Sequence, residues 1–376
     1  MIKFWSYKEE YNKIRKKILK NVDYTLSKGN IFFGEQIKKL EKNFAKKYKS
    51  KYGVAVGSGT DALAISLLAL DLKKGDEIIT AANTAIPTIS AIILAGAKPK
   101  LVDIGEDYLI DHKKITNSIN KNTKAIIPVH LYGHPCDMKN ILNIAKKYKL
   151  KVIEDCAQAQ GAMLNNKYVG TFGDFGCFSF YPTKIFGAYG DGGFILTNNF
   201  NLYKKIRRIR YYGIETFDKK NKFLNKYYAN ENGINSRIDE IQCSILNLKF
   251  ASINTDISKR IKLSNLYRKE LRNTNLVLPS KNKNLKHVYH LFTVYHPQRN
   301  IIIDYLKKNK IETRIIYEYP IQQMKAYNNM NVRNNCINAL IKSKGIFSLP
   351  LYPNLKEKNV LLICKKIKEC LKFHNI

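Results

Sequence analysis

Residues 151–193 read KVIEDCAQAQGAMLNNKYVGTFGDFGCFSFYPTKIFGAYGDGG and contain the features that decide the fold. Two short apolar runs, 151–155 and 177–181, are typical of buried strands. The first run ends in Asp155, and ligands bind at the carboxyl ends of strands in open α/β sheets. Asp155 therefore lies at the edge of a candidate site. The alternative for this residue is a helix N-cap, a position that Asp fills well.

The alternation of short strands and helices extends from residue 51 to residue 198. Runs rich in Val and Ile are separated by segments with helical periodicity, such as 61–70 and 138–147, and by glycine turns. This order predicts an α/β domain with a mainly parallel sheet covered by helices. A long helical pattern follows at 236–271, and the chain from about 276 onward has the pattern of a smaller α+β region. The seven expected strands are 52–56, 77–81, 99–104, 124–130, 151–155, 177–181 and 194–198.

Lys184 stands alone in a glycine-rich segment, 173–193, that is too irregular to be a helix. Six glycines and several aromatic residues surround it, whereas nearly every other lysine of the chain lies in a charged cluster. Burial in such surroundings lowers the pKa of a lysine and leaves a neutral amine, which can attack an aldehyde and form a Schiff base. The alternative is an ordinary surface lysine in a glycine-rich turn.

A second glycine motif, GSGT at 57–60, lies between the expected strand 52–56 and the expected helix 61–70. Backbone N–H groups at a helix N-terminus bind phosphate, and glycine lets the backbone approach the anion closely, so the motif predicts a phosphorylated ligand. GSGTDA also fits the dinucleotide fingerprint, in which an acidic residue ends the next strand about 20 residues later. Asp76 and Glu77 lie at that distance but precede their strand, so a nicotinamide cofactor is the weaker alternative.

Length and composition exclude several other classes of protein. A chain of 376 residues with 45% hydrophobic residues can bury the core of one large domain or two smaller ones. The apolar runs are shorter than the roughly 20 residues of a membrane span, and the charged N-terminus lacks the apolar segment of a signal peptide. We therefore expect a cytoplasmic protein without a membrane partner. Seven scattered cysteines without a CxxC pair, and histidines at 130, 134, 287 and 290, lead us to expect neither disulfides nor a metal site.

The formal net charge of +35 comes from 65 Lys and Arg against 30 Asp and Glu. The basic residues are spread in pairs that alternate with apolar residues, as on the solvent-facing side of amphipathic helices. We find no zinc-finger spacing, RNP-like run or basic tail, so a nucleic-acid partner is not expected. A positive surface that attracts a small anionic substrate is the functional alternative to simple solvation.

Several motifs together resemble the DegT family of pyridoxal-phosphate-dependent sugar-nucleotide aminotransferases. SGTDAL carries the phosphate loop, EDCAQAQGA the strand-end aspartate and FSFYPTKIFGAYGDGG the lysine. The resemblance continues, in the family's order, through KGNIFFGEQIKKLEKNFAKKY, VHLYGHPCDM, NSRIDEIQCSIL and FSLPLYPNL. It implies an aspartate-aminotransferase-like fold of type I. Residues 1–250 would form the large domain, with an N-terminal helical segment and a mainly parallel seven-stranded sheet, and residues 251–376 a small α+β domain.

The resemblance also implies roles for single residues. Lys184 would hold pyridoxal 5′-phosphate as a Schiff base and act as the general base. Asp155 would pair with the pyridine nitrogen and keep it protonated, and Gln158 would contact the 3-oxygen of the ring. The family builds each active site at the interface of a homodimer. The phosphate would accordingly be held by Gly59, Thr60, Ser179 and, from the neighbouring subunit, Asn235.

By the same resemblance, the enzyme transfers an amino group from L-glutamate to a nucleotide-linked keto sugar. The expected reaction is a ping-pong transfer through pyridoxamine phosphate, in lipopolysaccharide or other amino-sugar biosynthesis. The run PTKIFGAYGDGG is more similar to members that aminate C-3 than to members that aminate C-4. A dTDP-linked 3-keto-6-deoxyhexose is the first expectation, and C-4 amination of a UDP-linked 4-keto sugar is the second. Some relatives have histidine instead of Lys184 and act as dehydratases, so the lysine favours amination.

Two positions depart from the family pattern beside the expected substrate pocket. Many members stack an aromatic ring on the cofactor where NTAIPT has Ala85. The HYPxP stretch of the family is replaced by IYEYP at 316–320. The sequence therefore leaves open the nucleotide, the stereochemistry of the sugar and the residue that takes the place of the stacking ring.

Overall fold

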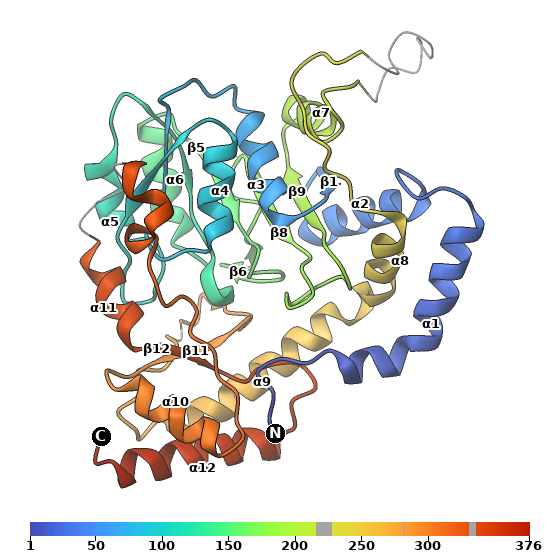
Figure 1. Ribbon diagram of the computed structural model, residues 1–376. Coiled ribbons are helices and arrows are strands. Elements are labelled where there is room, and N and C mark those ends of the chain that lie inside the picture. The colour runs from blue at the N-terminus through green and yellow to red at the C-terminus, as the bar shows by residue number, and fades with distance from the viewer. Residues whose placement is uncertain (216–227, 281, 331–335) are drawn as a thin grey trace.

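The computed structural model describes residues 1–215, 228–280, 282–330 and 336–376. Its centre is a seven-stranded sheet, which lies in the upper part of Figure 1. All seven expected strands are present, with ends within a few residues of the prediction. They are β1 (Tyr52–Val56), β2 (Glu77–Ala81), β3 (Lys98–Val102), β4 (Thr123–Ile127), β5 (Lys151–Asp155), β8 (Phe175–Ser179) and β9 (Gly193–Thr197).

The sheet is mainly parallel, as predicted. Its strand order is β1-β9-β8-β5-β4-β2-β3. The pairs from β8 to β3 are parallel, and only β9 runs antiparallel to both of its neighbours. The carboxyl ends of β1, β2, β4, β5 and β8 therefore meet at one edge of the sheet, where the loops that follow them can build a common site.

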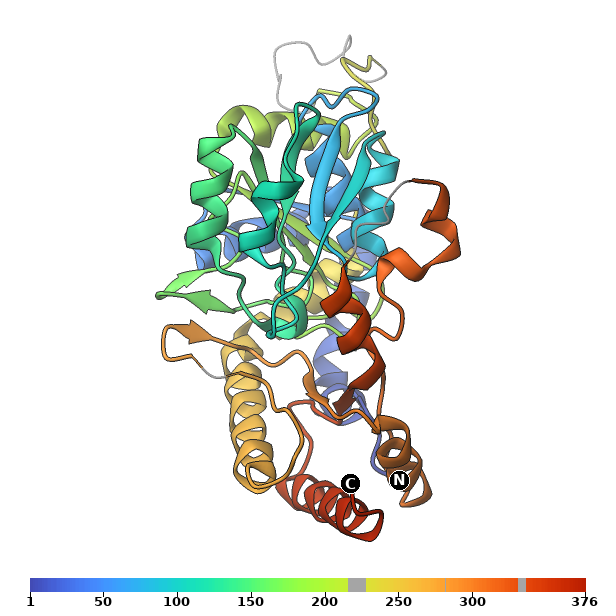
Figure 2. The ribbon, with the colours of Figure 1, turned by 90° about the vertical axis from the view of Figure 1, so that its left-hand side faces the viewer.

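Both faces of the sheet are covered, because successive side chains of a strand point to opposite sides. In β9, Ile195 faces one hydrophobic cluster, whereas Phe194 and Leu196 face another. The first cluster includes residues of the helices that follow β1, β2 and β4, and the second includes Phe44 from the N-terminal region. The helices, shown in Figures 1 and 2, are α1 (Lys8–Ser27), α2 (Glu35–Tyr48), α3 (Gly59–Leu68), α4 (Ile86–Leu94), α5 (His112–Ile115), α6 (Met138–Lys147), α7 (Phe200–Ile209), α8 (Glu240–Lys249), α9 (Ile253–Leu271), α10 (Arg299–Lys308), α11 (Ile337–Gly345) and α12 (Glu357–Phe373).

The helical pattern at 236–271 forms two helices, which corrects the single helix expected there. The side chain of Asp239 caps α8 by accepting the N–H of Gln242, and a 3₁₀ turn at Phe250–Ser252 separates α8 from α9. Such a turn changes the direction of the chain while side chains continue to be buried on both sides, so hydrophobic periodicity does not reveal it. The change of direction is needed because α8 packs on α1 and α2, whereas α9 packs on α12.

The C-terminal region lies below the sheet in Figure 1 and has its own hydrophobic cluster, which includes Tyr267, Phe292 and Phe347. Ile2 also belongs to this region, because its backbone bonds to Lys310 and Glu312. The division into domains 1–250 and 251–376 stays a prediction.

No helix among the described residues has the length and apolarity needed to cross a membrane. The short strands are β6 (Met163–Leu164), β7 (Lys167–Tyr168), β10 (Leu285–Lys286), β11 (Phe292–Tyr295) and β12 (Ile346–Leu349).

Candidate active site

A cavity of about 370 Å³ lies at the carboxyl edge of the sheet. Its walls come from the loops after β1, β2, β4, β5 and β8, together with Tyr317 and Met324 from the C-terminal region. Residues from strands far apart in the sequence thus meet at the edge where α/β proteins bind ligands. The structure brings together in this cavity six of the seven residues proposed from the sequence, namely Gly59, Thr60, Asp155, Gln158, Ser179 and Lys184.

One end of the cavity is formed by the N-terminus of α3. Ser58 caps this helix, because its Oγ accepts the N–H of Asp61 at 3.0 Å. The preceding N–H groups, those of Gly59 and Thr60, have no partner within the helix. A Cβ atom on Gly59 would lie 2.6 Å from the Cβ of Ser179, so glycine is required for this close approach. The helix N-terminus and the Ser179 hydroxyl form a polar end that fits a phosphate dianion.

Asp155 also lines the cavity and is 5% exposed. Its Oδ1 accepts the backbone N–H of Ala157 at 3.0 Å, and its Oδ2 accepts the hydroxyl of Thr88 at 2.9 Å. Burial raises the pKa of Asp155 above its ordinary value, while these two hydrogen bonds and the charge of Lys184 oppose the rise. A buried carboxylate at a cavity wall fits a protonated ring nitrogen, because an opposite charge stabilises the anion.

Lys184 lies in the loop after β8 and is half-buried. Its backbone N–H bonds to the carbonyl of Tyr181 at 2.9 Å, which forms a tight turn at the cavity wall. Burial lowers the pKa of Lys184 below that of a free lysine, and the nearby carboxylate of Asp155 opposes this shift. The lowered pKa favours the neutral amine that Schiff-base chemistry requires.

Gln158 is fixed by hydrogen bonds at both ends of its amide. Its Oε1 accepts the backbone N–H of Tyr132 at 2.8 Å, and its Nε2 donates to the hydroxyl of Tyr317 at 3.1 Å. Burial raises the pKa of Tyr317 well above its usual value, so its hydroxyl keeps its proton. This hydroxyl can donate that proton to a ligand in the cavity, because its oxygen already accepts from Gln158.

Sequence reasoning missed Tyr317, Thr88 and Tyr181 as residues of the site. Tyr317 belongs to IYEYP, the segment that departs from the family pattern, and this departure was the available signal. Ala85 lines the cavity beside Ile86, where many family members have the stacking ring. Among the described residues that line the cavity, Tyr181 and Tyr317 are the ones with aromatic rings.

Asn235 does not line the cavity of its own chain. Its side chain is exposed, and its Oδ1 accepts a hydrogen bond from Arg237 Nε at 2.8 Å. The adjacent Ser236 connects this segment to the phosphate loop, because its Oγ accepts the N–H of Gly57 at 2.9 Å. The reach of Asn235 into a neighbouring subunit stays a prediction.

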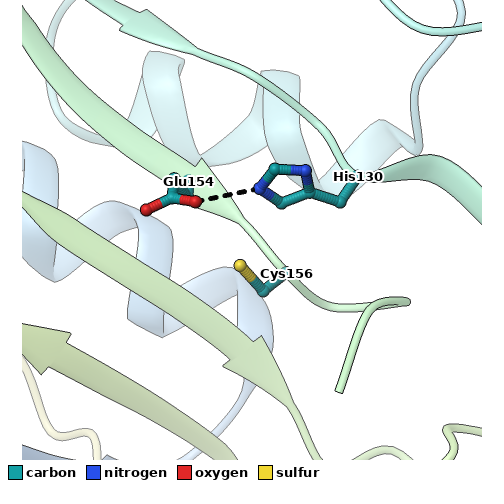
Figure 3. Close-up of side chains that lie close together, drawn as sticks. All are labelled: His130, Glu154 and Cys156. Atoms are coloured by element: carbon teal, nitrogen blue, oxygen red, sulfur yellow. Dashed lines mark hydrogen bonds and ion pairs between the residues drawn. The ribbon is translucent and has the colours of Figure 1, made fainter. Parts of the chain in front are cut away.

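A separate cluster of possible metal ligands, His130, Glu154 and Cys156, is completely buried (Figure 3). His130 accepts the N–H of Cys136 on Nδ1, so its Nε2 carries the proton donated to Glu154 at 3.1 Å. Burial raises the pKa of the Cys156 thiol, which disfavours the thiolate that metals bind. Glu154 also accepts the backbone N–H groups of Gly170, Phe172 and Gly173. The cluster therefore connects β5 to the segment before β8 through hydrogen bonds that use both ring nitrogens of His130 and both carboxylate oxygens of Glu154.

The fold and this cavity define a pyridoxal-phosphate-dependent transaminase of fold type I. The model of the DegT/DnrJ/EryC1/StrS aminotransferase family matches residues 12–368, and the chain belongs to this family. Membership in this family replaces the alternative interpretation of GSGTDA as a binding motif for a nicotinamide dinucleotide. The cofactor is pyridoxal 5′-phosphate, and a related solved structure, ntda from Bacillus subtilis, holds bound pyridoxamine phosphate (TM-score 0.86, 31% identity, covering 96% of this chain and 82% of that chain).

Relatives with known names are similar over almost the full length of the chain. A dTDP-3-amino-3,6-dideoxy-α-D-galactopyranose transaminase of Aneurinibacillus thermoaerophilus is 38% identical, covering 96% of this chain and 97% of the relative. A UDP-N-acetyl-3-dehydro-α-D-glucosamine 3-aminotransferase of Acidithiobacillus ferrooxidans is 36% identical, covering 95% of each chain. The structure of S. venezuelae DesV in complex with a ketimine intermediate superimposes with a TM-score of 0.92 at 30% identity, covering 98% of each chain.

Proposed function

We propose that this enzyme transfers an amino group from L-glutamate to C-3 of a nucleotide-linked keto sugar, for cell-surface glycan or other amino-sugar biosynthesis. The first candidate substrate is a dTDP-linked 3-keto-6-deoxyhexose. The observation that carries the proposal is the gathering of Lys184, Asp155 and the phosphate-type helix N-terminus around one cavity. The relatives named for dTDP-3-amino sugars support the sugar class.

The polar residues named above have distinct chemical tasks in this proposal. When bound, pyridoxal phosphate supplies an electron sink that makes the carbon beside the amino group acidic. The neutral Nζ of Lys184 first binds the cofactor and then moves the proton to and from that carbon. Asp155 holds a proton on the ring nitrogen, and the N–H groups of Gly59 and Thr60 hold the phosphate. Gln158 would contact the 3-oxygen of the ring, and its Nε2 also donates to the Tyr317 hydroxyl.

Two observations support a nucleotide-linked substrate, namely the positive net charge of the chain and the names of its relatives. A chain with a formal charge of +35 raises the local concentration of a sugar that carries a diphosphate. The relative named for a UDP-linked 3-dehydro sugar makes a UDP-linked 3-keto sugar the second candidate, with the same position of amination. C-4 amination of a UDP-linked 4-keto sugar, the second expectation from the sequence, remains the alternative for the position.

A substrate panel tests this proposal. We expect kcat/KM for the dTDP-linked 3-keto sugar to exceed that for 4-keto isomers by at least about tenfold, because a misplaced carbonyl leaves polar groups of the site unpaired. Added salt should lower kcat/KM for nucleotide-linked sugars and leave a neutral keto sugar unaffected, because salt screens the positive field. Equal rates with the neutral and the nucleotide-linked sugar would contradict the charge argument, and faster turnover of 4-keto sugars would contradict C-3.

We further propose that the active sites are shared across a homodimer, with Asn235 reaching the phosphate of its partner. Mixing refolded Lys184→Ala and Asn235→Ala chains, each inactive alone, tests this. About half of the dimers would be mixed and each would contain one intact site, so activity should recover to roughly a quarter of the unmodified level. If Asn235 served its own chain, no site in the mixture would be intact and no activity would recover. A mixture of Lys184→Ala with unmodified chains is the control for subunit exchange.

A further inference from the structure

Two buried threonines form a hydrogen-bonded chain that ends on Asp155. Thr84 Oγ1 lies 2.9 Å from Thr88 Oγ1, and Thr88 Oγ1 donates to Asp155 Oδ2 at 2.9 Å. Thr84 is 1% exposed and Thr88 is 0% exposed, so water does not compete for these hydroxyls. The segment therefore connects the start of α4 directly to the strand-end carboxylate. No role of these threonines follows from the motifs of the sequence.

The direction of this chain follows from the chemistry of its end. An ionised carboxylate only accepts hydrogen bonds, so the hydroxyl proton of Thr88 must point to Asp155. The oxygen of Thr88 is then free to accept, and Thr84 donates its own proton to it. Both hydroxyl dipoles are thus aligned toward the negative charge, which strengthens the final hydrogen bond.

The chain fixes the second oxygen of a carboxylate whose first oxygen is already held. Ala157 N–H comes from the loop after β5, and Thr88 comes from the first turns of α4. Two donors on different elements fix the plane of the Asp155 carboxylate relative to the cavity. Ala85, Ile86 and Pro87, between the two threonines in sequence, line the same cavity. One short segment therefore shapes the cavity and supports its carboxylate.

The charge of Asp155 needs this support. Burial disfavours the ionised form of a carboxylate, and hydrogen bonds to the anion oppose that effect. Burial is the largest cause of the raised pKa of Asp155, and the donors from Ala157 and Thr88 lower it again. Without the Thr88 hydroxyl, the Asp155 carboxylate would keep only one of its two hydrogen-bond donors. Its pKa would therefore be higher, and it would stay protonated up to a higher pH.

We propose that Thr88, oriented by Thr84, is a positioning residue that keeps Asp155 ionised and directed at the cavity, so that it can hold the protonated nitrogen of the cofactor. The proposal rests on the proposed role of Asp155. It predicts that the hydroxyl at position 88, and not only the volume of its side chain, determines how tightly the protein binds pyridoxal 5′-phosphate. Valine and serine at this position separate these two properties.

The test measures the dissociation constant of pyridoxal 5′-phosphate for the full-length protein, after removal of bound cofactor, across the neutral pH range. Thr88→Val should raise this constant roughly ten- to hundredfold, the range for a hydrogen bond to a charged group. The pH at which binding becomes half-maximal should move upward, because Asp155 ionises later, and the difference from the unmodified protein should shrink as pH rises. Thr88→Ser should stay within about threefold, and Thr84→Val should lie between the two.

The pH comparison needs the other groups near Asp155 to be the same in all variants. None of the substitutions changes the titratable groups that interact electrostatically with Asp155. These groups are Lys184, His130, Tyr317, Cys136, Cys156 and Cys177.

Two results would overturn the inference. A Thr88→Val protein that unfolds at lower urea concentration but binds cofactor with unchanged affinity and pH dependence would show a purely structural threonine. Equal weakening by serine and valine would show that packing, not the hydroxyl, matters. Asp155→Asn is measured beside them: if it binds cofactor as the unmodified protein does, the proposed role of Asp155 fails as well. Weakening by Asp155→Asn alone would reject only the role of Thr88.

Discussion

Lys184→Ala is expected to lower transamination by at least about a thousandfold, because we propose that one amine both holds the cofactor and transfers the proton. Turnover is measured from 2-oxoglutarate release with a keto-sugar nucleotide as acceptor. In the unmodified protein, borohydride should attach the mass of the cofactor to the peptide that contains residue 184. Retained transamination in the variant, or a labelled peptide from elsewhere in the chain, would refute the assignment.

The loss in Lys184→Ala should come without loss of folding. Burial lowers the pKa of Lys184 below its ordinary value of 10.5, so the unfolded chain binds more protons than the native one. The free energy of unfolding therefore decreases as pH falls from 10.5 through the lowered pKa, and stays reduced below it. Lys184→Ala has no buried amine, so its free energy of unfolding is not reduced in this way. The variant without cofactor should resist urea at neutral pH at least as well as the unmodified protein.

An exposed lysine provides the matched control. Lys167→Ala, in the β6–β7 hairpin outside the cavity, removes the same chemical group from a solvent-exposed position. It should leave transamination and borohydride labelling unchanged. A comparable loss of activity in this control would show that the assay reports the general charge of the protein and not the chemistry of Lys184.

Asp155→Asn is expected to have the second largest effect, a loss in kcat of at least about a hundredfold, as for removal of one preorganised electrostatic partner. Asparagine keeps the shape of the side chain, and its amide can donate to the Thr88 hydroxyl, which rotates to accept. What the variant lacks is the negative charge that we propose to hold a proton on the ring nitrogen. Single-turnover measurement of each half-reaction should therefore show slow proton transfer rather than failure to fold.

Asp174→Asn is the matched control for Asp155→Asn. Asp174 directly precedes β8 and lies beside the start of β5, where it accepts hydrogen bonds from Lys151 and from the N–H of Val152. Its substitution removes one negative charge from the far end of the neighbouring strand pair but not from the cavity. We expect kcat to change by less than about twofold, since such surface ion pairs contribute little. An Asp155→Asn enzyme with kcat equal to that of this control would exclude Asp155 from the chemistry.

The strands and the main site motifs could be predicted because their signals are local. Each strand is a short apolar run bounded by glycine or polar residues, and α6 occupies the predicted range 138–147. Gly59 comes shortly after β1, Asp155 ends β5 and Lys184 lies in the loop after β8. Parallel strands bring their carboxyl ends to one edge. Once the sheet was predicted to be mainly parallel, the gathering of these residues followed from its geometry.

Other parts of the site depend on contacts between distant segments. Tyr317 reaches Gln158 across 159 positions of sequence, and Thr88 reaches Asp155 across 67. No periodicity or spacing connects such pairs, because the distance between them is set by how the C-terminal region and α4 pack against the sheet. The 3₁₀ turn between α8 and α9 was missed for a related reason, since burial continues on both sides of it.

The amino-acid sequence by itself determined the α/β class, the order of the strands along the chain and the chemical groups of the site, because these depend on residue type and on neighbours a few positions away. Only the tertiary structure decided that the Thr88 hydroxyl holds Asp155, that Tyr181 and Tyr317 line the cavity, and that His130 and Glu154 are hydrogen-bonded to each other. Those properties depend on hydrogen-bond directions and burial, and both exist only after distant segments of the chain have packed together.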